Sequence, residues 1–331
     1  MTPWLLPVAQ LSWLLLVPGP AQWPADVRHQ IPARVGAARR LAPVTAAAQV
    51  RVVTDIDDTI KSSGGVALAG IPLGGVDTSY RRNSFYPGVF SFGAELSANA
   101  IGLNRRPARV AVLTARAEEF KWALEIKQSD KICTGFRDAG RARGLADGWG
   151  IGPVLYGSVA EWVCQERKGW RKFENFKKLF AANAQQRLGY VFVGDNGSSE
   201  KDLEAAEMII AEFPDALRAV FVHAVSGERQ PAPLPEDHEI DGVPVRYFRT
   251  YATAAAKAER LGLMSAGAAR RVCDVVEAEM RADTVNIAPG SQNEKLLLEE
   301  LAEARGLARR RVGGALASIW RRRPKLGRSA T

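Results

Sequence analysis

The sequence predicts an α/β protein with a doubly wound parallel sheet, a small flap insertion and a helical extension at its C-terminal end. Short β-branched runs recur between about residues 49 and 250, and longer helix-like stretches lie between them. Strands that alternate with helices are typical of a parallel sheet covered on both faces. The expected strands are Val50–Thr54, Arg109–Thr114, Pro153–Gly157, Tyr190–Gly194 and Leu217–His223, and the expected helices are Glu118–Lys127, Val159–Ala182 and Ser199–Glu212.

The composition is that of a globular protein and excludes several other classes. The chain has 331 residues, of which 47% are hydrophobic and 24% are charged. No apolar run reaches the roughly 18–20 residues that span a bilayer, which excludes a polytopic membrane protein. The 3 cysteines are far apart and form no CxxC pair, which argues against a disulfide scaffold or a structural zinc site.

We divide the chain into three parts. Residues 1–48 form a leader and linker whose apolar start is interrupted by prolines. It has small residues suited to cleavage, Gly19 and Ala21, but no basic segment before its apolar core, so a targeting peptide and an unstructured leader both stay open. Residues 49–250 form the α/β domain, and residues 251–331 form a helical extension with a basic tail. We expect a protein of the cytoplasm or of a membrane surface.

The helical extension shows two kinds of helix signal. Its first half suggests two helices separated near residues 262–267, where glycines interrupt the pattern. Ser291 and Glu294 then form an S-x-x-E capping box, followed by leucines and alanines at helical spacing from Leu297 onward.

The first expected strand leads directly into the acidic segment Asp55–Thr59, with the sequence DIDDT. Side chains two positions apart in an extended segment share a face, so Asp55 and Asp57 point together. Acids at the carboxyl end of a strand lie in the ligand-binding crevice of such sheets, and Mg²⁺ is usually held there by one or two carboxylates with substrate phosphate. One carboxylate can attack phosphorus while the other handles the proton of the leaving oxygen. An acidic turn is the alternative, whereas the spacing of a calcium-binding EF-hand loop is absent.

Polar residues also follow two other expected strands. The hydroxyl of Thr114 can bond a phosphoryl oxygen, although a plain helix N-cap is the alternative. Asp195, in the sequence GDNG, is a natural second metal ligand, or else a β-turn residue. Asp202 and Glu200 follow on the next helix, and either acid could complete the metal shell.

A cation is needed to neutralise a phosphate and to orient the nucleophile. The segment 168–180, KGWRKFENFKKLF, is an amphipathic helix that leads into the fourth expected strand. Lys172 lies at the start of this helix, and we expect it to be the cation that neutralises the phosphate. Lys168 is the alternative.

These motifs, in this order, are similar to those of the haloacid dehalogenase superfamily. They are D-x-D-x-T after strand one, Thr after strand two, Lys before strand four and GD after strand four. More narrowly, DIDDTIKSS, the FYPGVF segment (Phe85–Phe90) and KFENFKKLF followed by VFVGDNG resemble the App1-like phosphatidate phosphatase catalytic domain. The resemblance covers about residues 50–250.

The resemblance implies a role for each matched residue. It makes Asp55 the nucleophile that forms an aspartyl-phosphate and Asp57 the general acid/base. It places Mg²⁺ on Asp55, the backbone carbonyl of Asp57 and Asp195, with Asp202 as the further acid, and it makes Thr114 and Lys172 the pair that orients the phosphate. The sequence departs from the family at its second motif, which is here Leu-Thr-Ala-Arg, and in the late position of Asp202.

The expected function is therefore Mg²⁺-dependent hydrolysis of phosphatidate to diacylglycerol and phosphate. Two alternatives stay open: a phosphatase for soluble or protein phosphomonoesters, and a module that binds phosphatidate without hydrolysing it. Residues 61–108 lie where the superfamily places cap elements, and the stretch GGVALAGIPLGG is expected to form a glycine-flanked hairpin that serves as a flap.

The net charge is concentrated in the tail. Residues 301–331 carry +8 of the +9 total. A general nucleic-acid binder more often spreads its charge over the folded surface, so no nucleic-acid partner is expected. Residues 315–328 combine basic residues with Leu316, Ile319 and Trp320. Such a segment favours peripheral binding to an anionic phospholipid membrane, with a disordered solubilising tail or a nuclear-type signal as the alternative.

Overall fold

A computed structural model describes most of the chain from residue 49 to residue 306. The described residues are 49–68, 71–72, 75–99, 106–117, 126–157, 168–186, 188–197, 201–227, 234–282 and 290–306. The predictions for the leader, for most of the helix 118–127, for the start of the helix 159–182, for Glu200 and for the basic tail fall outside these residues.

The described residues form a seven-stranded sheet with the order β5-β4-β1-β6-β7-β9-β8. All neighbouring strands pair in parallel except β8 and β9, which are antiparallel. The strands are β1 (Val50–Thr54), β4 (Val110–Ala117), β5 (Ile151–Gly157), β6 (Gly189–Asp195), β7 (Leu217–His223), β8 (His238–Ile240) and β9 (Val243–Phe248).

The order of the strands makes β1 the turning point of the sheet. From β1 the chain adds β4 and β5 on one side, and it then returns to add β6, β7 and β9 on the other. Ligands of doubly wound sheets bind beyond the carboxyl ends of the strands at such a point. The residues that follow β1 therefore lie where a ligand of this fold would bind.

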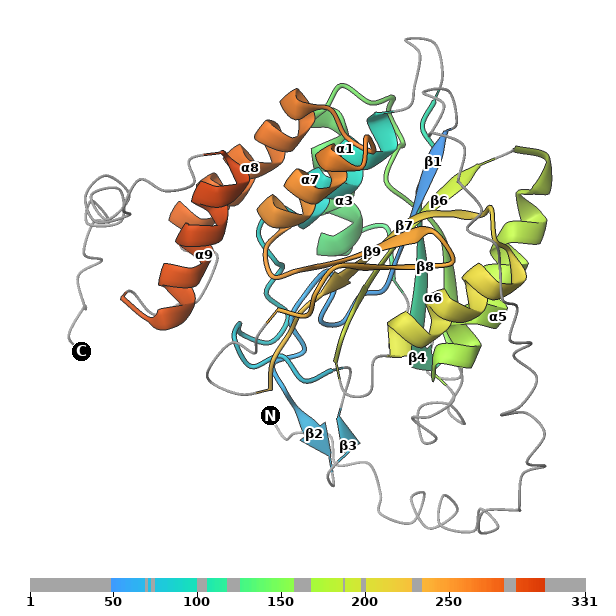
Figure 1. Cartoon of the computed structure of the whole chain (residues 1–331), viewed down its shortest axis with the longest axis horizontal. Helices are drawn as coiled ribbons and strands as arrows, with labels where there is room; N and C mark the ends of the chain where they lie inside the picture. Colours follow the sequence, from blue (N-terminus) through green and yellow to red (C-terminus); the bar gives the residue numbers. More distant parts are fainter. Residues whose placement is uncertain are drawn as a thin grey trace. The chain divides into compact units, whose positions relative to one another are not determined.

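Helices cover both faces of the sheet (Figure 1). Of the α-helices in the described residues, two pack on one face, and the other five lie on the opposite face. The first group is α5 (Lys168–Ala182) and α6 (Lys201–Glu212); the second is α1 (Val89–Ala98), α3 (Lys131–Ala142), α7 (Tyr251–Arg260), α8 (Ala266–Arg281) and α9 (Gln292–Ala304). This arrangement confirms the α/β, doubly wound fold class.

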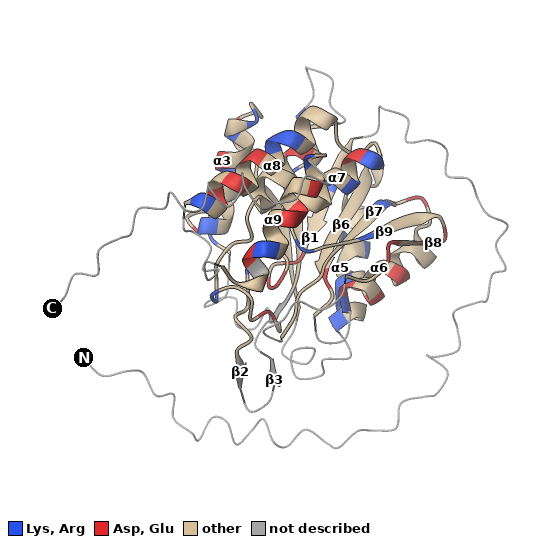
Figure 2. Cartoon of the chain, turned by 60° about the vertical axis from the view of Figure 1, so that its left-hand side comes forward, with Lys and Arg blue, Asp and Glu red and all other residues tan. Residues whose placement is uncertain are grey.

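Alternating side chains of the central strands build the two cores. On β1, Val52 packs in the core under α1 and α7, whereas Val53 packs in the core under α5 and α6. Period-two alternation sends successive side chains to opposite faces, and both faces are buried here. Every residue of β1 is accordingly buried. Figure 2 shows acidic and basic residues interspersed over the helices that cover the sheet.

The structure contains elements that the sequence analysis did not predict. The strands β8 and β9 extend the sheet beyond β7, and α1 and α3 lie in the segments between β1 and β5. The short strands β2 (Ala67–Leu68) and β3 (Ile71–Pro72) pair as the expected hairpin. A cap domain of the haloacid dehalogenase kind is not confirmed, because α1 packs in the core instead.

The C-terminal helices share the core of the sheet. Thr250, Ser265 and Ser291 cap α7, α8 and α9, and each accepts a hydrogen bond from the backbone N–H three residues on. The capping-box residue Glu294 also accepts from the N–H of Gly290. The described residues all belong to one compact unit. None of the described helices has the length and apolar character that crossing a bilayer would require.

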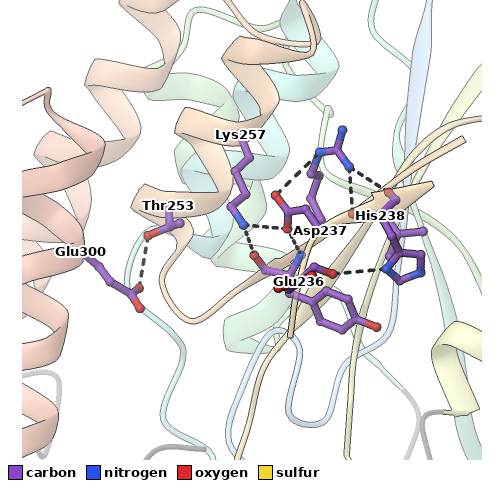
Figure 3. Close-up of polar contacts among 9 residues, drawn as sticks. Glu236, Asp237, His238, Thr253, Lys257 and Glu300 are labelled. Atoms are coloured by element: carbon purple, nitrogen blue, oxygen red, sulfur yellow. Dashed lines mark hydrogen bonds and ion pairs between the residues drawn. The ribbon is translucent and has the colours of Figure 1, made fainter. Parts of the chain in front are cut away.

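Polar contacts fasten α7 to its neighbours on two sides (Figure 3). Lys257 of α7 donates to the carboxylate of Asp237 at 2.8 Å and to the carbonyl of Tyr247 in β9 at 2.7 Å. Glu300 of α9 accepts from the hydroxyl of Thr253 at 3.2 Å. The helix that begins at residue 251 is therefore tied both to the sheet and to the last helix.

Candidate active site

Two carboxylates meet at the turning point of the sheet because their strands are neighbours. Asp55 directly follows β1, and Asp195 ends β6. The two strands pair in parallel as far as Thr54 and Val193, and the N–H of Asp55 donates to the carbonyl of Val193 at 3.1 Å. Since parallel strands present their carboxyl ends at one edge, both acids lie at the same rim.

A third acid reaches this rim from α6. Asp202 lies in the first turn of that helix, and its carboxylate accepts a hydrogen bond from the N–H of Asp195 at 3.1 Å. Gly194 permits this approach, because a Cβ there would come closer than 3.0 Å to the Asp202 side chain. The glycine of the GD motif is thus required by packing against an acid eight residues further on.

Asp55, Asp195 and Asp202 form an acidic triad that could hold a metal ion. One carboxylate oxygen from each lies within 4.8 Å of the others. The donor set consists only of oxygen atoms, which suits a hard cation. Asp55 and Asp202 are 7% and 3% exposed, so water compensates little of their charge.

Burial dominates the electrostatics of the triad. It raises the pKa of Asp55 to about 6, even though Lys172 lowers it, and Asp202 raises it further. Burial, followed by the charges of Asp202 and Asp58, raises the pKa of Asp195 well above its ordinary value. These shifts express a shortage of positive charge, which a bound cation would supply.

Lys172 is the basic residue that the structure brings into the triad. Its ammonium nitrogen lies 2.9 Å from Oδ2 of Asp55 and also pairs with Asp202. Burial lowers the pKa of Lys172, but Asp202 and Asp55 more than offset this and raise it above the ordinary value. Lys168 lies one turn earlier on α5. Burial, together with the charge of Lys172, lowers the pKa of Lys168.

The carboxylate of Asp57 is not part of the acidic triad. It is half-buried, and its Oδ1 lies 3.7 Å from the ammonium of Lys61. Lys61 in turn donates to Oδ1 of Asn83 at 2.5 Å. The side chain that the sequence analysis assigned to both proton transfer and metal binding thus lies beside a lysine. The role of its backbone carbonyl as a metal ligand stays a prediction.

Thr114 lies inside a strand rather than after one. The expected strand ended at this residue, but β4 continues to Ala117. Thr114 is buried and lies two residues beyond Val112, which pairs with Thr54 of β1. It is therefore level with the residues that follow β1, and an N-cap role is excluded by its place in a strand.

Asp58 has a structural role that the sequence analysis missed. It is fully buried, and its carboxylate accepts hydrogen bonds from the N–H groups of Ser63 at 2.8 Å, Val76 at 2.5 Å and Asp77 at 2.9 Å. These groups lie at the two ends of the segment that carries the β2–β3 hairpin. The sequence signal for this role was Asp58 itself, the acid that directly follows D-x-D. An Asp in a turn often accepts hydrogen bonds from backbone N–H groups.

Comparisons of the chain with family models, with curated proteins and with solved structures found no match.

Proposed function

We propose that this protein is a Mg²⁺-dependent phosphatase of the haloacid dehalogenase type that acts through an aspartyl-phosphate. The observation that carries the proposal is the approach of the Asp55, Asp195 and Asp202 carboxylates to within 4.8 Å, with Lys172 beside Asp55. This site lies where a doubly wound sheet binds its ligand. The resemblance of DIDDT, Thr114, Lys172 and GD to the motifs of that superfamily gives the same assignment.

In the proposed reaction, a carboxylate oxygen of Asp55 attacks the phosphorus in line, and the bond from phosphorus to the leaving oxygen breaks. Asp57 gives its proton to that oxygen. Water then attacks the aspartyl-phosphate, Asp57 takes a proton from the water, and phosphate and free Asp55 are released. Lys172 orients the attacking carboxylate, and Thr114 bonds a phosphoryl oxygen. Positioning and electrostatics supply most of the rate in phosphoryl transfer.

The acidic triad would hold Mg²⁺, which uses oxygen ligands and usually needs only one or two carboxylates besides substrate phosphate. When bound, it offsets the negative charge of the phosphoryl oxygens. The raised pKa values of Asp55 and Asp195 support a cation here, because the acids lack enough positive charge from the protein alone.

The proposed substrate is phosphatidate, presented at an anionic membrane surface. The narrower resemblance to App1-like phosphatidate phosphatases supports this choice. The basic tail supports it as well, since a Lys or Arg near an anionic lipid surface contributes about 1 kcal/mol to binding. We propose that the tail makes the protein a peripheral membrane enzyme of lipid metabolism.

The test is phosphate release from phosphatidate in vesicles and from p-nitrophenyl phosphate, each with and without Mg²⁺. We expect Mg²⁺-dependent release from phosphatidate, abolished by Asp55→Asn and unchanged by Asp138→Asn on the outer surface of α3. Deleting residues 313–331 should weaken sedimentation with anionic vesicles.

Three outcomes would count against parts of the proposal. Release from the soluble ester alone would overturn the lipid substrate and favour a phosphomonoester phosphatase. Vesicle binding without release from either substrate would overturn catalysis and favour a phosphatidate-binding module. Full activity of Asp55→Asn would overturn the nucleophile assignment.

A further inference from the structure

The turn that follows β1 has a backbone conformation that needs support. Asp58 has φ 60°, in the left-handed region. This conformation is costly for a residue with a side chain and persists only when its surroundings hold it. The turn carries Asp55 and Asp57, so whatever holds it also sets the directions of the two acids.

Two side chains from outside the motifs bond to the carbonyl groups of this turn. The hydroxyl of Tyr251, the first residue of α7, donates to the carbonyl oxygen of Thr59 at 2.7 Å. Nδ1 of His223, the last residue of β7, lies 2.6 Å from the carbonyl oxygen of Asp58. A carbonyl oxygen only accepts hydrogen bonds, so Nδ1 is the donor.

Both donors are held firmly by burial and by aromatic packing. Tyr251 is 1% exposed and His223 is 2% exposed. The His223 ring stacks on Phe248 with centroids 5.1 Å apart and meets Tyr86 edge-on at 4.3 Å, and Phe248 also contacts Tyr251. Nε2, at the other end of the ring, faces the carbonyl oxygen of Arg249 at 3.1 Å.

The turn after β1 also contacts the acidic triad. The hydroxyl of Thr59 lies 3.5 Å from Oδ2 of Asp195, and Asp195 pairs with His223 across β6 and β7. The contacts on Asp58 and Thr59 therefore tie the turn after β1 to the strand that supplies the neighbouring acid.

We propose that His223 and Tyr251 are positioning residues for the acids of the site. Their hydrogen bonds to two successive carbonyl groups hold the turn so that Asp55 faces Asp195 and Asp57 faces the leaving group. The kinetic part of this inference rests on the proposed phosphatase function. The structural part, which concerns the order of residues 56–62, does not.

The experiment compares variants that remove or keep each donor. Tyr251→Phe removes only the hydroxyl. His223→Gln places its amide near Nε2 and loses the donor at Nδ1, whereas His223→Asn places its amide nitrogen near Nδ1 and keeps it. Tyr190→Phe is the matched control, since Tyr190 is buried at the opposite end of β6. The readouts are kcat and KM on the better substrate, and amide hydrogen exchange of residues 56–62 by mass spectrometry.

Misplacing reacting groups by about 1 Å can cost on the order of 100-fold in rate. We therefore expect Tyr251→Phe and His223→Gln to lower kcat by about 10- to 100-fold, with KM little changed and with faster exchange over residues 56–62. His223→Asn should restore most of kcat, and Tyr190→Phe should behave as the unmodified protein.

Wild-type kcat and exchange in Tyr251→Phe would overturn the inference even if the histidine variants do not fold. So would equal losses in Tyr251→Phe and Tyr190→Phe. If the unmodified protein releases no phosphate from any substrate, the proposed function fails, and the exchange data alone decide on the positioning role.

Discussion

The balance of charge between individual residues explains why the site suits a cation. Asp55 is paired with Lys172 at 2.9 Å, yet its pKa is raised to about 6. An ion pair normally lowers the pKa of an acid, but here burial and the nearby carboxylates outweigh the lysine. A buried group of this kind is rarely stable without further compensation. The raised pKa of Asp55 is therefore consistent with a triad that could hold a metal ion.

Gly194 offers a test of the triad in which none of its three acids is substituted. Gly194→Ala would add a Cβ that overlaps with the Asp202 side chain, and so displace that acid from Asp195. Changes just outside the ligand shell typically cost about 10- to 100-fold in metal affinity, and we expect a loss of this size for Mg²⁺ binding by calorimetry. Gly267→Ala, on the exposed side of α8, is the control. Equal affinities in the two variants would contradict the triad.

Residues at strand tips could be predicted from sequence, whereas their partners could not. Asp55 and Asp195 follow from strand order, because parallel strands bring their ends together, and Lys172 follows from its place at the start of the helix that leads into the fourth expected strand. The sequence did not decide between Asp202 and Glu200, because that choice depends on which side of α6 faces the ends of the strands. His223 and Tyr251 carry no local signal, since each acts on a backbone carbonyl far away in the sequence. The place of Asp57, outside the triad and beside Lys61, could not be predicted from the strand pattern either.

At the scale of elements, α1 is fastened to two other helices through one buried acid. Glu95 is 3% exposed and accepts from Arg143 at the end of α3 and from Arg271 of α8. The distances are 2.8 Å to Arg143 and 2.6 Å and 2.8 Å to Arg271. The sequence analysis missed α1 because the FYPGVF segment before it was used only as a family motif.

Removing this acid should weaken the packing of three helices. Hydrogen bonds to charged groups contribute roughly 1.5–3 kcal/mol each, but both arginines are partly exposed and can be rehydrated. We expect Glu95→Ala to lower the free energy of unfolding by about 2 kcal/mol, measured by urea denaturation. Asp138→Ala breaks the exposed pair with Arg141 and should change it by less than about 0.5 kcal/mol. If both variants change the free energy of unfolding by a similarly small amount, Glu95 does not stabilise the packing of the three helices.

The hairpin of β8 and β9 could not be predicted from the sequence pattern. Its turn is Asp241-Gly242, both with positive φ, and an Asp-Gly pair is a strong hairpin signal. The first strand, however, has the sequence HEI and is mostly exposed at the sheet edge. Without a buried, β-branched run before the turn, the strand could not be distinguished from a loop.

At the scale of the whole molecule, the boundary expected at residue 250 does not separate two cores. Helices α7 and α8 bury Ala254, Ala255, Val272 and Val276 completely against the elements of the sheet domain. The sequence predicted these helices correctly as elements. Their partners could not be predicted, because an apolar helix face does not specify which apolar surface covers it.

This packing predicts the effect of two truncations. A chain of residues 1–250 would expose the face of the sheet that α7 and α8 cover, and large exposed apolar faces cause aggregation. We expect it to be insoluble or to lack a cooperative thermal transition. A chain of residues 1–306 retains α7, α8 and α9 and should unfold at the temperature of the full chain. Cooperative unfolding of the shorter chain would show that the C-terminal helices are dispensable.

The hydrogen bonds of Asp58 connect the hairpin segment to the turn that carries Asp55 and Asp57. The carboxylate of Asp58 accepts hydrogen bonds from backbone N–H groups at both ends of the hairpin segment, and its carbonyl oxygen accepts one from His223. A displacement of the hairpin would therefore act on the residue that follows Asp57, to which the proposed function assigns proton transfer. In the proposed enzyme, Asp58 would couple the position of the hairpin over the site to the alignment of Asp55 and Asp57.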